Sequence, residues 1–380
     1  MRILLVVLLA SVVFAGCASK DKKDDPMKPA KLVKFEASAK LKKVWSRSAG
    51  DGQDKRYSRF VPAVTRSAVY VADVDGNVYA FDALKGKRIW KSSLKKDISA
   101  AISEADGQLY LGTYDGEIIA LNAENGEVLW EKQASSEISS IPASNGRIVV
   151  AQSIDGGVMG LNAKDGEKVW TFDHPVPILT LRGAASPVFA GQKVLLPFES
   201  GQIVALSASE GVSLWEARVG QPKGSTELDK IVDVDSSPLV IGQTIYAATF
   251  QGSIGAFEEG QGRPMWKKPL STYTDLAYDS GKVFASAEDS TVYAFNSING
   301  NEEWRNEFLH RRDIKAPAVI GDYVAVIDEK GYLHLLKQED GSFAYRFKPS
   351  GDDFRSPMVS ANSMLYILAD DGRITAYKLK

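Results

Sequence analysis

Residues 109–122 read LYLGTYDGEIIALN, and Gly126 and Trp130 follow shortly after them. Two apolar runs flank an Asp-Gly pair in this stretch, a pattern typical of two antiparallel strands joined by a tight turn. We expect the whole unit to hold four strands, near 99–103, 108–113, 117–122 and 127–132. Four strands in about 40 residues is the size of one β-propeller blade. The stretch therefore predicts a propeller.

The same unit recurs from about residue 67 to the C-terminus. The turn position falls at Gly76, Gly116, Gly156, Gly201, Gly252, Ser290, Gly331 and Gly372. An aromatic residue follows each of the first seven turns by 14 residues, at Trp90, Trp130, Trp170, Trp215, Trp266, Trp304 and Tyr345. A second glycine lies four residues before each aromatic residue, at Gly86, Gly126, Gly166, Gly211, Gly262, Gly300 and Gly341. Fixed offsets repeated this often indicate eight copies of one blade.

The two chain ends predict how the ring closes. After Gly372 the eighth unit has room only for its third strand, residues 373–380. Residues 41–47 read LKKVWSR and contain Trp45, so they supply the missing fourth strand. No stretch of the body shows sustained helical periodicity. We therefore predict an all-β, eight-bladed propeller of four-stranded antiparallel blades, closed by pairing of the N- and C-terminal strands, which leaves no open sheet edge between the first and last blades.

The periodic aromatic residues have a structural and a functional interpretation. As functional groups they would stack on a sugar or a cofactor. Because they recur at one position of the repeat, packing of each blade against its neighbour is favoured. The residues assigned to this role are Trp45, Trp90, Trp130, Trp170, Trp215, Trp266, Trp304 and Tyr345.

Composition excludes several classes of function. The 380 residues carry 46 Lys and Arg against 48 Asp and Glu, so no cationic excess is available for a phosphate backbone, and nucleic acid is not an expected partner. Cys17 is the single cysteine, which excludes an internal disulfide and a Cys-rich zinc site. The three histidines, His174, His310 and His334, are far apart in sequence.

The N-terminus predicts export and a lipid anchor. Residues 3–15 form an apolar run after Arg2, too short for a permanent span and typical of a signal peptide. The sequence FAGC at residues 14–17 resembles the bacterial lipobox, in which the cysteine is lipidated and becomes the mature N-terminus. An ordinary secretory signal with a coincidental cysteine is the alternative. Residues 18 and 19 are Ala-Ser rather than Asp, which resembles lipoproteins sent to the outer membrane of Gram-negative bacteria.

We expect three segments: a signal peptide over 1–16, a lipidated flexible tether over 17–39, and a single propeller over 40–380. Residues 20–31 carry charges of both signs and little to bury, as a tether requires. A basic lipid-binding patch is the alternative for this run, and its three aspartates weaken that interpretation.

The repeat resembles the tryptophan-docking repeat of pyrroloquinoline-quinone dehydrogenases, as in Ala123, Gly126 and Trp130 after the third strand. That likeness implies the fold and not the chemistry. No cysteine pair, nucleophile elbow, phosphate loop or zinc-binding helix motif is present, so we expect no catalytic residues, no metal and no cofactor. Asp73, Asp75 and Asn77 suggest a calcium loop, but Asp-Gly-Asn is first a hairpin turn.

A lipobox followed by eight docking repeats is similar to the BamB family, lipoprotein subunits of the bacterial outer-membrane β-barrel assembly machinery. Two segments, 176–183 and 224–235, resemble family loops that contact the barrel-forming subunit, BamA. The resemblance implies a non-enzymatic scaffold on the periplasmic face of the outer membrane, docking onto periplasmic domains of BamA beside other assembly-complex subunits and nascent outer-membrane proteins. It also implies partner-binding residues, which are Leu179, Leu181, Arg182, Asp233 and Asp235.

The repeat intervals indicate the same two loops independently. Most turns are 38 to 41 residues apart, but the intervals ending at Gly201 and Gly252 are 45 and 51. The extra length lies between blades 3 and 4 and between blades 4 and 5, on one face of the disc, and extra loop length is where function concentrates. The leucines of the first loop have a second interpretation, in which they fold back onto the blade.

The two aspartates also have two interpretations. Asp233 and Asp235 alternate with valines, so we expect them to project together from the start of a strand. Alternatively they cap the loop or pair with Arg182. For the whole chain, the competing function is a small-molecule or carbohydrate binder, or a PQQ-like quinoprotein, that uses the central channel.

Overall fold

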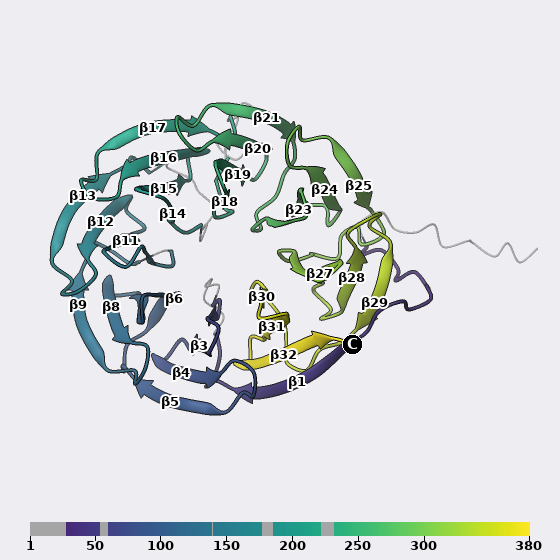
Figure 1. The fold of residues 1–380 in the computed structure, drawn as a ribbon, viewed down its shortest axis with the longest axis horizontal. Helices are drawn as coiled ribbons and strands as arrows, with labels where there is room; N and C mark the ends of the chain where they lie inside the picture. Colours follow the sequence, from purple (N-terminus) through teal and green to yellow (C-terminus); the bar gives the residue numbers. More distant parts are fainter. Residues whose placement is uncertain (1–27, 54–59, 139, 177–184, 222–231) are drawn as a thin grey trace, which may run out of the picture.

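The computed structural model describes residues 28–53, 60–138, 140–176, 185–221 and 232–380. Within these ranges the chain forms 32 strands in eight four-stranded antiparallel sheets. The sheets stand around a central axis as the blades of a propeller (Figure 1). The predicted eight-bladed propeller is confirmed. None of the described residues belongs to a helix of the length and apolarity needed to cross a membrane.

In each blade the strands run from the centre of the ring to its rim. Blade 1 contains β2 (Ala63–Val64), β3 (Ala68–Ala72), β4 (Asn77–Asp82) and β5 (Arg88–Ser93), and blade 2 contains β6 (Ile98–Ala105), β7 (Gln108–Thr113), β8 (Glu117–Asn122) and β9 (Val128–Gln133). Blade 3 contains β10 (Ala143–Ser144), β11 (Ile148–Gln152), β12 (Gly157–Asn162) and β13 (Lys168–Asp173), and blade 4 contains β14 (Val188–Ala190), β15 (Lys193–Phe198), β16 (Gln202–Ser207) and β17 (Ser213–Arg218).

The second half of the ring repeats this order. Blade 5 contains β18 (Leu239–Ile241), β19 (Thr244–Ala248), β20 (Ser253–Glu258) and β21 (Pro264–Pro269), and blade 6 contains β22 (Ala277–Asp279), β23 (Lys282–Ser286), β24 (Val292–Asn296) and β25 (Glu302–Asn306). Blade 7 contains β26 (Ala318–Ile320), β27 (Tyr323–Ile327), β28 (Leu333–Lys337) and β29 (Phe343–Phe347), and blade 8 contains β30 (Val359–Ala361), β31 (Met364–Leu368), β32 (Arg373–Leu379) and β1 (Leu41–Ser48).

The ring closes through blade 8, where the first and last strands of the chain pair. The rim strand β1 pairs antiparallel with β32, and Trp45 lies opposite Ala376. Figure 1 shows β1 along the outside of β32, beside the C-terminus. The predicted pairing of N- and C-terminal strands is therefore confirmed, and blades 1 and 7 each have blade 8 as a neighbour.

The rim tryptophans sit on the next blade. Trp90 of blade 1 donates from Nε1 to the carbonyl of Ala123 at 3.0 Å, and a Cβ on Gly126 would lie 2.6 Å from its ring. Gly126 also has φ +75°, so only glycine fits this turn under the indole. The same packing of an indole ring on a glycine recurs between Trp45 and Gly86, Trp130 and Gly166, Trp170 and Gly211, Trp215 and Gly262, Trp266 and Gly300, and Trp304 and Gly341.

Each docked indole is aimed by a register shift in its own blade. In blade 2, Trp130 pairs with Ala120, and a bulge follows between Ala120 and Leu121. A bulge turns the strand and re-aims the side chain, and the small partner residue leaves space for the ring. Tyr345 takes this position in blade 7, and it packs on the cluster containing Leu41 and Tyr377 of blade 8.

The strand boundaries predicted for blade 2 agree closely with the structure. The second and third strands were expected at 108–113 and 117–122, which are the bounds of β7 and β8. The outer strand is shifted by one residue, and the inner strand β6 is longer at its C-terminal end than the predicted 99–103.

The segment 28–40 departs from the expectation of a flexible tether. Its backbone follows blade 7: Ala30 donates to the carbonyl of His310 at 3.0 Å, and Ser38 donates to the carbonyl of Ala344 at 2.9 Å. The ring of Phe35 stacks on Phe343 with centroids 5.3 Å apart. We call residues 28–40 the strap. The preceding residues, with the expected signal peptide, Cys17 and the start of the tether, lie outside the described ranges.

Candidate partner-binding face

One face of the disc carries the connections between blades. In seven of the blades an amide two residues before the turn donates to a carbonyl of the incoming connection. These bonds are Val74 to Gly52 at 3.0 Å, Tyr114 to Asp97 at 3.0 Å, Ile154 to Glu137 at 2.9 Å, Phe250 to Asp233 at 3.1 Å, Glu288 to Ser271 at 2.9 Å, Glu329 to Arg312 at 2.9 Å and Asp370 to Asp352 at 3.2 Å. These connections, with the described end of the long connection from blade 4 to blade 5, therefore share a face with the turns between second and third strands.

The residues expected to contact a partner fall into two groups. Leu179, Leu181 and Arg182 lie in 177–184, outside the described residues. Asp233 and Asp235 lie in the described connection from blade 4 to blade 5, just after the undescribed stretch 222–231.

Asp233 and Asp235 are buried, with 1 % and 5 % of their surface exposed. The neighbouring Val232 and Val234 are buried as well. The prediction that the carboxylates project from the start of a strand is therefore wrong, because β18 begins only at Leu239. Alternation assumes one face on the core and one in water, whereas this segment is enclosed on both sides.

Blades 4 and 5 hold this segment between them. The amide of Val234 donates to the carbonyl of Phe198 in blade 4 at 3.4 Å, and the carbonyl of Asp233 accepts from Phe250 in blade 5. Ser236 Oγ donates to the carbonyl of Ala248 at 3.2 Å. The connection thus has a fixed backbone where it enters blade 5, directly after the long loop.

Two titratable groups flank the long connections on blade 4. Burial raises the pKa of Glu199, which follows β15 in the turn of the blade. Burial lowers the pKa of His174, whose ring centroid is 3.9 Å from that of Phe198. The side chains of Glu199 and His174 are therefore partly shielded from water.

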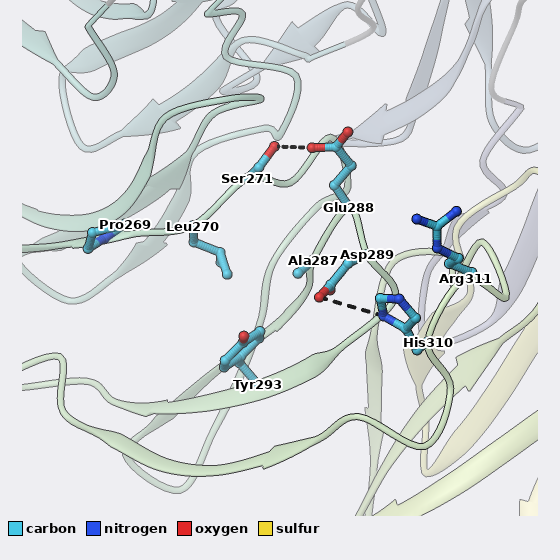
Figure 2. Close-up of a pocket in the computed structure, with 9 residues that line it drawn as sticks. All are labelled: Pro269, Leu270, Ser271, Ala287, Glu288, Asp289, Tyr293, His310 and Arg311. Atoms are coloured by element: carbon cyan, nitrogen blue, oxygen red, sulfur yellow. Dashed lines mark hydrogen bonds and ion pairs between the residues drawn. The ribbon is translucent and has the colours of Figure 1, made fainter. Parts of the chain in front are cut away.

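A hollow of about 460 Å³ opens on the same face between blades 5 and 6. Its walls come from the end of β21, the turn of blade 6 and the connection to blade 7, and are formed by Pro269, Leu270, Ser271, Ala287, Glu288, Asp289, Tyr293, His310 and Arg311. Ser271 Oγ donates to Glu288 Oε2 at 2.7 Å, and Asp289 Oδ2 lies 3.8 Å from His310 Nδ1; both pairs are joined by dashed lines in Figure 2. The two acidic side chains of this hollow, Glu288 and Asp289, each have a partner within the hollow itself.

There are two further hollows, one beside the hollow just described and one near the centre of the ring. One of about 250 Å³ shares Pro269 with the first, includes Lys267 and Lys268, and is bounded by Gln221, the last described residue before the long loop. Another of about 750 Å³ lies along the inner strands β22, β26 and β30. This central hollow is lined mainly by small and apolar residues with Asp275, Asp279 and Asp322.

The acidic residues of the face have local partners. Asp73 Oδ1 accepts the amide of Asn77 at 2.7 Å, and Asp73 Oδ2 accepts Asn77 Nδ2 at 2.9 Å. The hairpin interpretation of this turn is therefore correct, and the calcium loop is not needed to explain it. Within the described ranges, no group of three or more His, Cys, Asp and Glu side chains is placed to hold a metal ion.

The sequence interpretation missed a buried polar cluster in blade 7. Asp328 Oδ2 accepts from Arg312 Nε at 2.7 Å and from His334 Nε2 at 3.1 Å, while Arg346 Nε donates to His334 Nδ1 at 2.9 Å. The neutral imidazole therefore carries its proton on Nε2. The one available signal was Arg312, because the equivalent position of the other described connections holds Gly, Asp, Glu or Ser.

Burial and hydrogen bonding act in opposite directions in this cluster. Burial pushes the pKa of Asp328 upward, but hydrogen bonds from His334, the Tyr332 amide and Arg312 outweigh it, so the pKa lies below its usual value. Burial lowers the pKa of His334, and the bond to Asp328 only partly offsets that effect. The stable state is a carboxylate beside a neutral imidazole and two guanidinium groups.

Comparison with known proteins gives one consistent result. The sequence profile of the family described as "Outer membrane protein assembly factor BamB" matches residues 74–306 and 288–380. The protein of that description from Pseudomonas aeruginosa is 44 % identical over 374 residues, covering 98 % of both chains. The one from Alkalilimnicola ehrlichii is 43 % identical over 375 residues, covering 99 % of this chain and 96 % of the relative.

A solved structure agrees with these relatives. The crystal structure of BamB from Moraxella catarrhalis superposes with a TM-score of 0.81 at 28 % identity. The match covers 89 % of this chain and 99 % of that one. The fold and the sequence therefore lead to the same family.

Proposed function

Because this chain belongs to the BamB family of outer membrane protein assembly factors, we propose that it acts as a scaffold that docks onto periplasmic domains of BamA. Its family is one of assembly factors and not of enzymes, in agreement with the sequence-based expectation. In this proposal the docking elements are the long connections into and out of blade 4. Other assembly-complex subunits and nascent outer-membrane proteins are its further partners.

The observation that carries the proposal is the placement of the second long connection. Its described end, 232–236, is fixed between blades 4 and 5 on the face that carries all the described connections. A rigid base of this kind holds a loop ready for a partner at a low entropic cost. Leu179, Leu181 and Arg182 supply the contact chemistry, since an apolar centre beside an arginine is typical of a binding hot spot.

In this proposal Asp233 and Asp235 position the long connection and do not contact the partner directly. Buried carboxylates contact a partner poorly, but they can accept hydrogen bonds that fix the connection to which they belong. The earlier alternative, in which the aspartates cap the loop or pair with Arg182, is therefore favoured over direct contact.

The experiment is co-purification of BamA with the acylated protein from detergent-solubilised membranes. Leu179→Ala combined with Arg182→Glu should lower BamA recovery at least about tenfold, as expected when a hot-spot pair is lost. The matched control is Leu84→Ala with Arg88→Glu, which makes the same changes at two exposed residues of blade 1. Unchanged recovery in the loop variant, or its loss together with thermal unfolding, would overturn the docking role.

We also propose that Cys17 carries the lipid anchor at the outer membrane. An acylated cysteine with several chains holds a protein firmly on a bilayer without a membrane span. Cys17→Ser should give a periplasmic protein that still binds BamA in solution, because the anchor supplies local concentration and not contacts. A Cys17→Ser protein that is folded but does not bind BamA would contradict this division of roles.

A further inference from the structure

We propose that blade 7 holds a docking site for the protein's own N-terminal strap, residues 28–40, and that this site sets where the tether leaves the disc. The inference rests on the proposed anchor at Cys17 for its consequence, but the site itself is argued from contacts within the structure. Its occupant is the strap of the same chain.

Two arginines donate hydrogen bonds to the backbone of the strap. Arg312 Nη1 donates to the carbonyl of Ala30 at 2.8 Å, and Arg346 Nη1 donates to the carbonyl of Val33 at 2.8 Å. Hydrogen bonds from a charged donor are about twice as strong as those between neutral groups. Both arginines bind main-chain carbonyls, so these two contacts depend on the backbone conformation of the strap and not on its side chains.

The buried cluster described above orients both arginines. Arg312 is 7 % exposed and is held by Asp328, which also accepts from His334. Arg346 in turn donates to His334. Each guanidinium therefore presents a fixed remaining N–H to the strap, as a preorganised binding site does.

An aromatic side chain of the strap, Phe35, packs against both Arg346 and Phe343 of blade 7. The Arg346 guanidinium carbon lies 4.9 Å from the ring centroids of both Phe35 and Phe343, and these two rings stack. Cation–π contacts of this kind favour arginine over lysine because the guanidinium is planar. Phe35 is thus the side-chain anchor of the strap.

The C-terminal part of the strap runs along the rim strand of blade 7. Ser38 and Ala39 both donate to the carbonyl of Ala344, at 2.9 and 3.2 Å, and Lys40 accepts from Lys380 at 3.0 Å. Ala344 is fully buried, unlike the exposed Val44, Ile89, Leu129 and Val169 that precede the docked tryptophans of other blades. The strap covers the rim at this blade.

The consequence is a shorter and directed tether. An extended chain spans roughly 3.5 Å per residue, so Cys17 lies within roughly 45 Å of its attachment if the first fixed contact is at Ala30. Without the strap contacts the first fixed residue would be Leu41 in β1, and the reach would be roughly 80 Å. We call the contacts between the strap and blade 7 the clamp. Because the tether starts at the clamp, the blade 7 side of the disc lies nearest the membrane.

Limited trypsin digestion of the purified full-length mature protein tests the clamp. Arg346→Ala should speed cleavage after Lys31 and Lys34 at least about tenfold, because proteolysis follows the population of the open segment. Cleavage after Lys22 and Lys23, before the strap, should be unchanged. Arg305→Ala is the matched control: it removes the arginine that follows the docked tryptophan of blade 6 and touches no strap residue.

Phe35→Ser keeps the test valid if Arg346→Ala unfolds the blade, since Phe35 lies in the strap. It should give the same faster cleavage with unchanged thermal unfolding of the propeller. Equal cleavage rates in the wild type and Phe35→Ser would overturn the clamp. A wild-type dimer on gel filtration that becomes a monomer in Phe35→Ser would assign the strap to a second copy and also overturn the proposal.

Energy transfer to vesicles tests the consequence for the tether. The acylated protein is placed in phosphatidylethanolamine–phosphatidylglycerol vesicles with acceptor headgroups, and a donor is attached at Asp340→Cys in blade 7 or at Asp165→Cys, the same position in blade 3. Transfer should be higher from position 340, and Phe35→Ser should remove the difference. Equal transfer in the wild type would overturn the directed tether, while BamA recovery in the co-purification tests docking separately.

Discussion

The boundary between blades 4 and 5 and the boundary between blades 6 and 7 use the same position of the repeat in different ways. Asp233 and Arg312 occupy equivalent places, because each gives its carbonyl to an amide two residues before the next turn. Both side chains are buried. Arg312 donates to the protein's own N-terminal strap, whereas Asp233 lies in the described end of a long connection proposed to bind BamA.

The comparison shows how a repeat acquires function without changing its frame. The turns, the bulges and the docked tryptophans are nearly the same at both boundaries. What differs is one polar residue at a fixed position and the length of chain around it. A regular repeat therefore supplies rigid positions, and local departures from it decide what each boundary binds.

The largest expected effect comes from breaking the blade 6–7 boundary at its buried acid. Asp328→Ala leaves the Arg312 guanidinium buried without its carboxylate, which should lower the free energy of unfolding by about 3–5 kcal/mol. Urea unfolding followed by circular dichroism measures this loss. A loss below about 1 kcal/mol would mean that water or another group replaces the carboxylate, and the clamp geometry would need revision.

The equivalent change at the blade 4–5 boundary should affect binding more than stability. Asp233→Asn with Asp235→Asn keeps the shape of both side chains and removes their charges. We expect BamA recovery to fall at least about tenfold, because hydrogen bonds to charged groups hold the loop more strongly than neutral ones. Recovery equal to that of the wild type, measured in the same co-purification, would make the two charges dispensable for docking.

The repeat predicted most of the fold, because the glycine and tryptophan offsets are local sequence features. Trp45 and residues 373–380 predicted the closure, and the turns predicted β7 and β8 to the residue. The strap was not predicted, since its few apolar residues stand among lysines in the run KLVKF at 31–35, and the strap meets blade 7 only through contacts some 300 residues away. The burial of Asp233 was missed for the same reason, because two different blades enclose it.

Acid should weaken the blade 6–7 boundary selectively. In the unfolded chain His334 takes up a proton near pH 6.5, whereas burial lowers its pKa in the folded protein, so stability falls as the pH drops below about 6.5. Asp328 adds a second loss of stability at lower pH, because hydrogen bonds hold its pKa in the folded protein below its usual value. Thermal unfolding between pH 7.5 and 5 measures the first step, and His334→Gln should flatten it.

A pH profile identical in the wild type and His334→Gln would contradict this assignment. The groups facing the imidazole are Asp328, Arg312 and Arg346, and only Asp328 is an acid. The buried carboxylate therefore provides the single favourable charge for a protonated His334, and the two arginines oppose it.

The smallest effect distinguishes the docked indoles of the two boundaries. Trp304 Nε1 donates to the carbonyl of Gln338 at 2.8 Å, whereas the buried Trp215 Nε1 has no hydrogen-bond acceptor among the described residues. Replacement by phenylalanine should therefore cost about 1 kcal/mol more at Trp304 than at Trp215, the net value of one buried hydrogen bond. Urea unfolding of Trp304→Phe and Trp215→Phe gives the difference, and equal losses would show that the indole bond adds nothing.

Photo-crosslinking in intact membranes tests the division between the two boundaries most directly. A benzophenone amino acid replaces either Leu181, in the long connection before blade 4, or Phe308, which is 60 % exposed in the connection before blade 7. We predict an adduct with BamA from position 181 and, from position 308, only crosslinks within this chain, to blade 7 and the strap. Adducts with BamA from position 308 and none from position 181 would contradict the account.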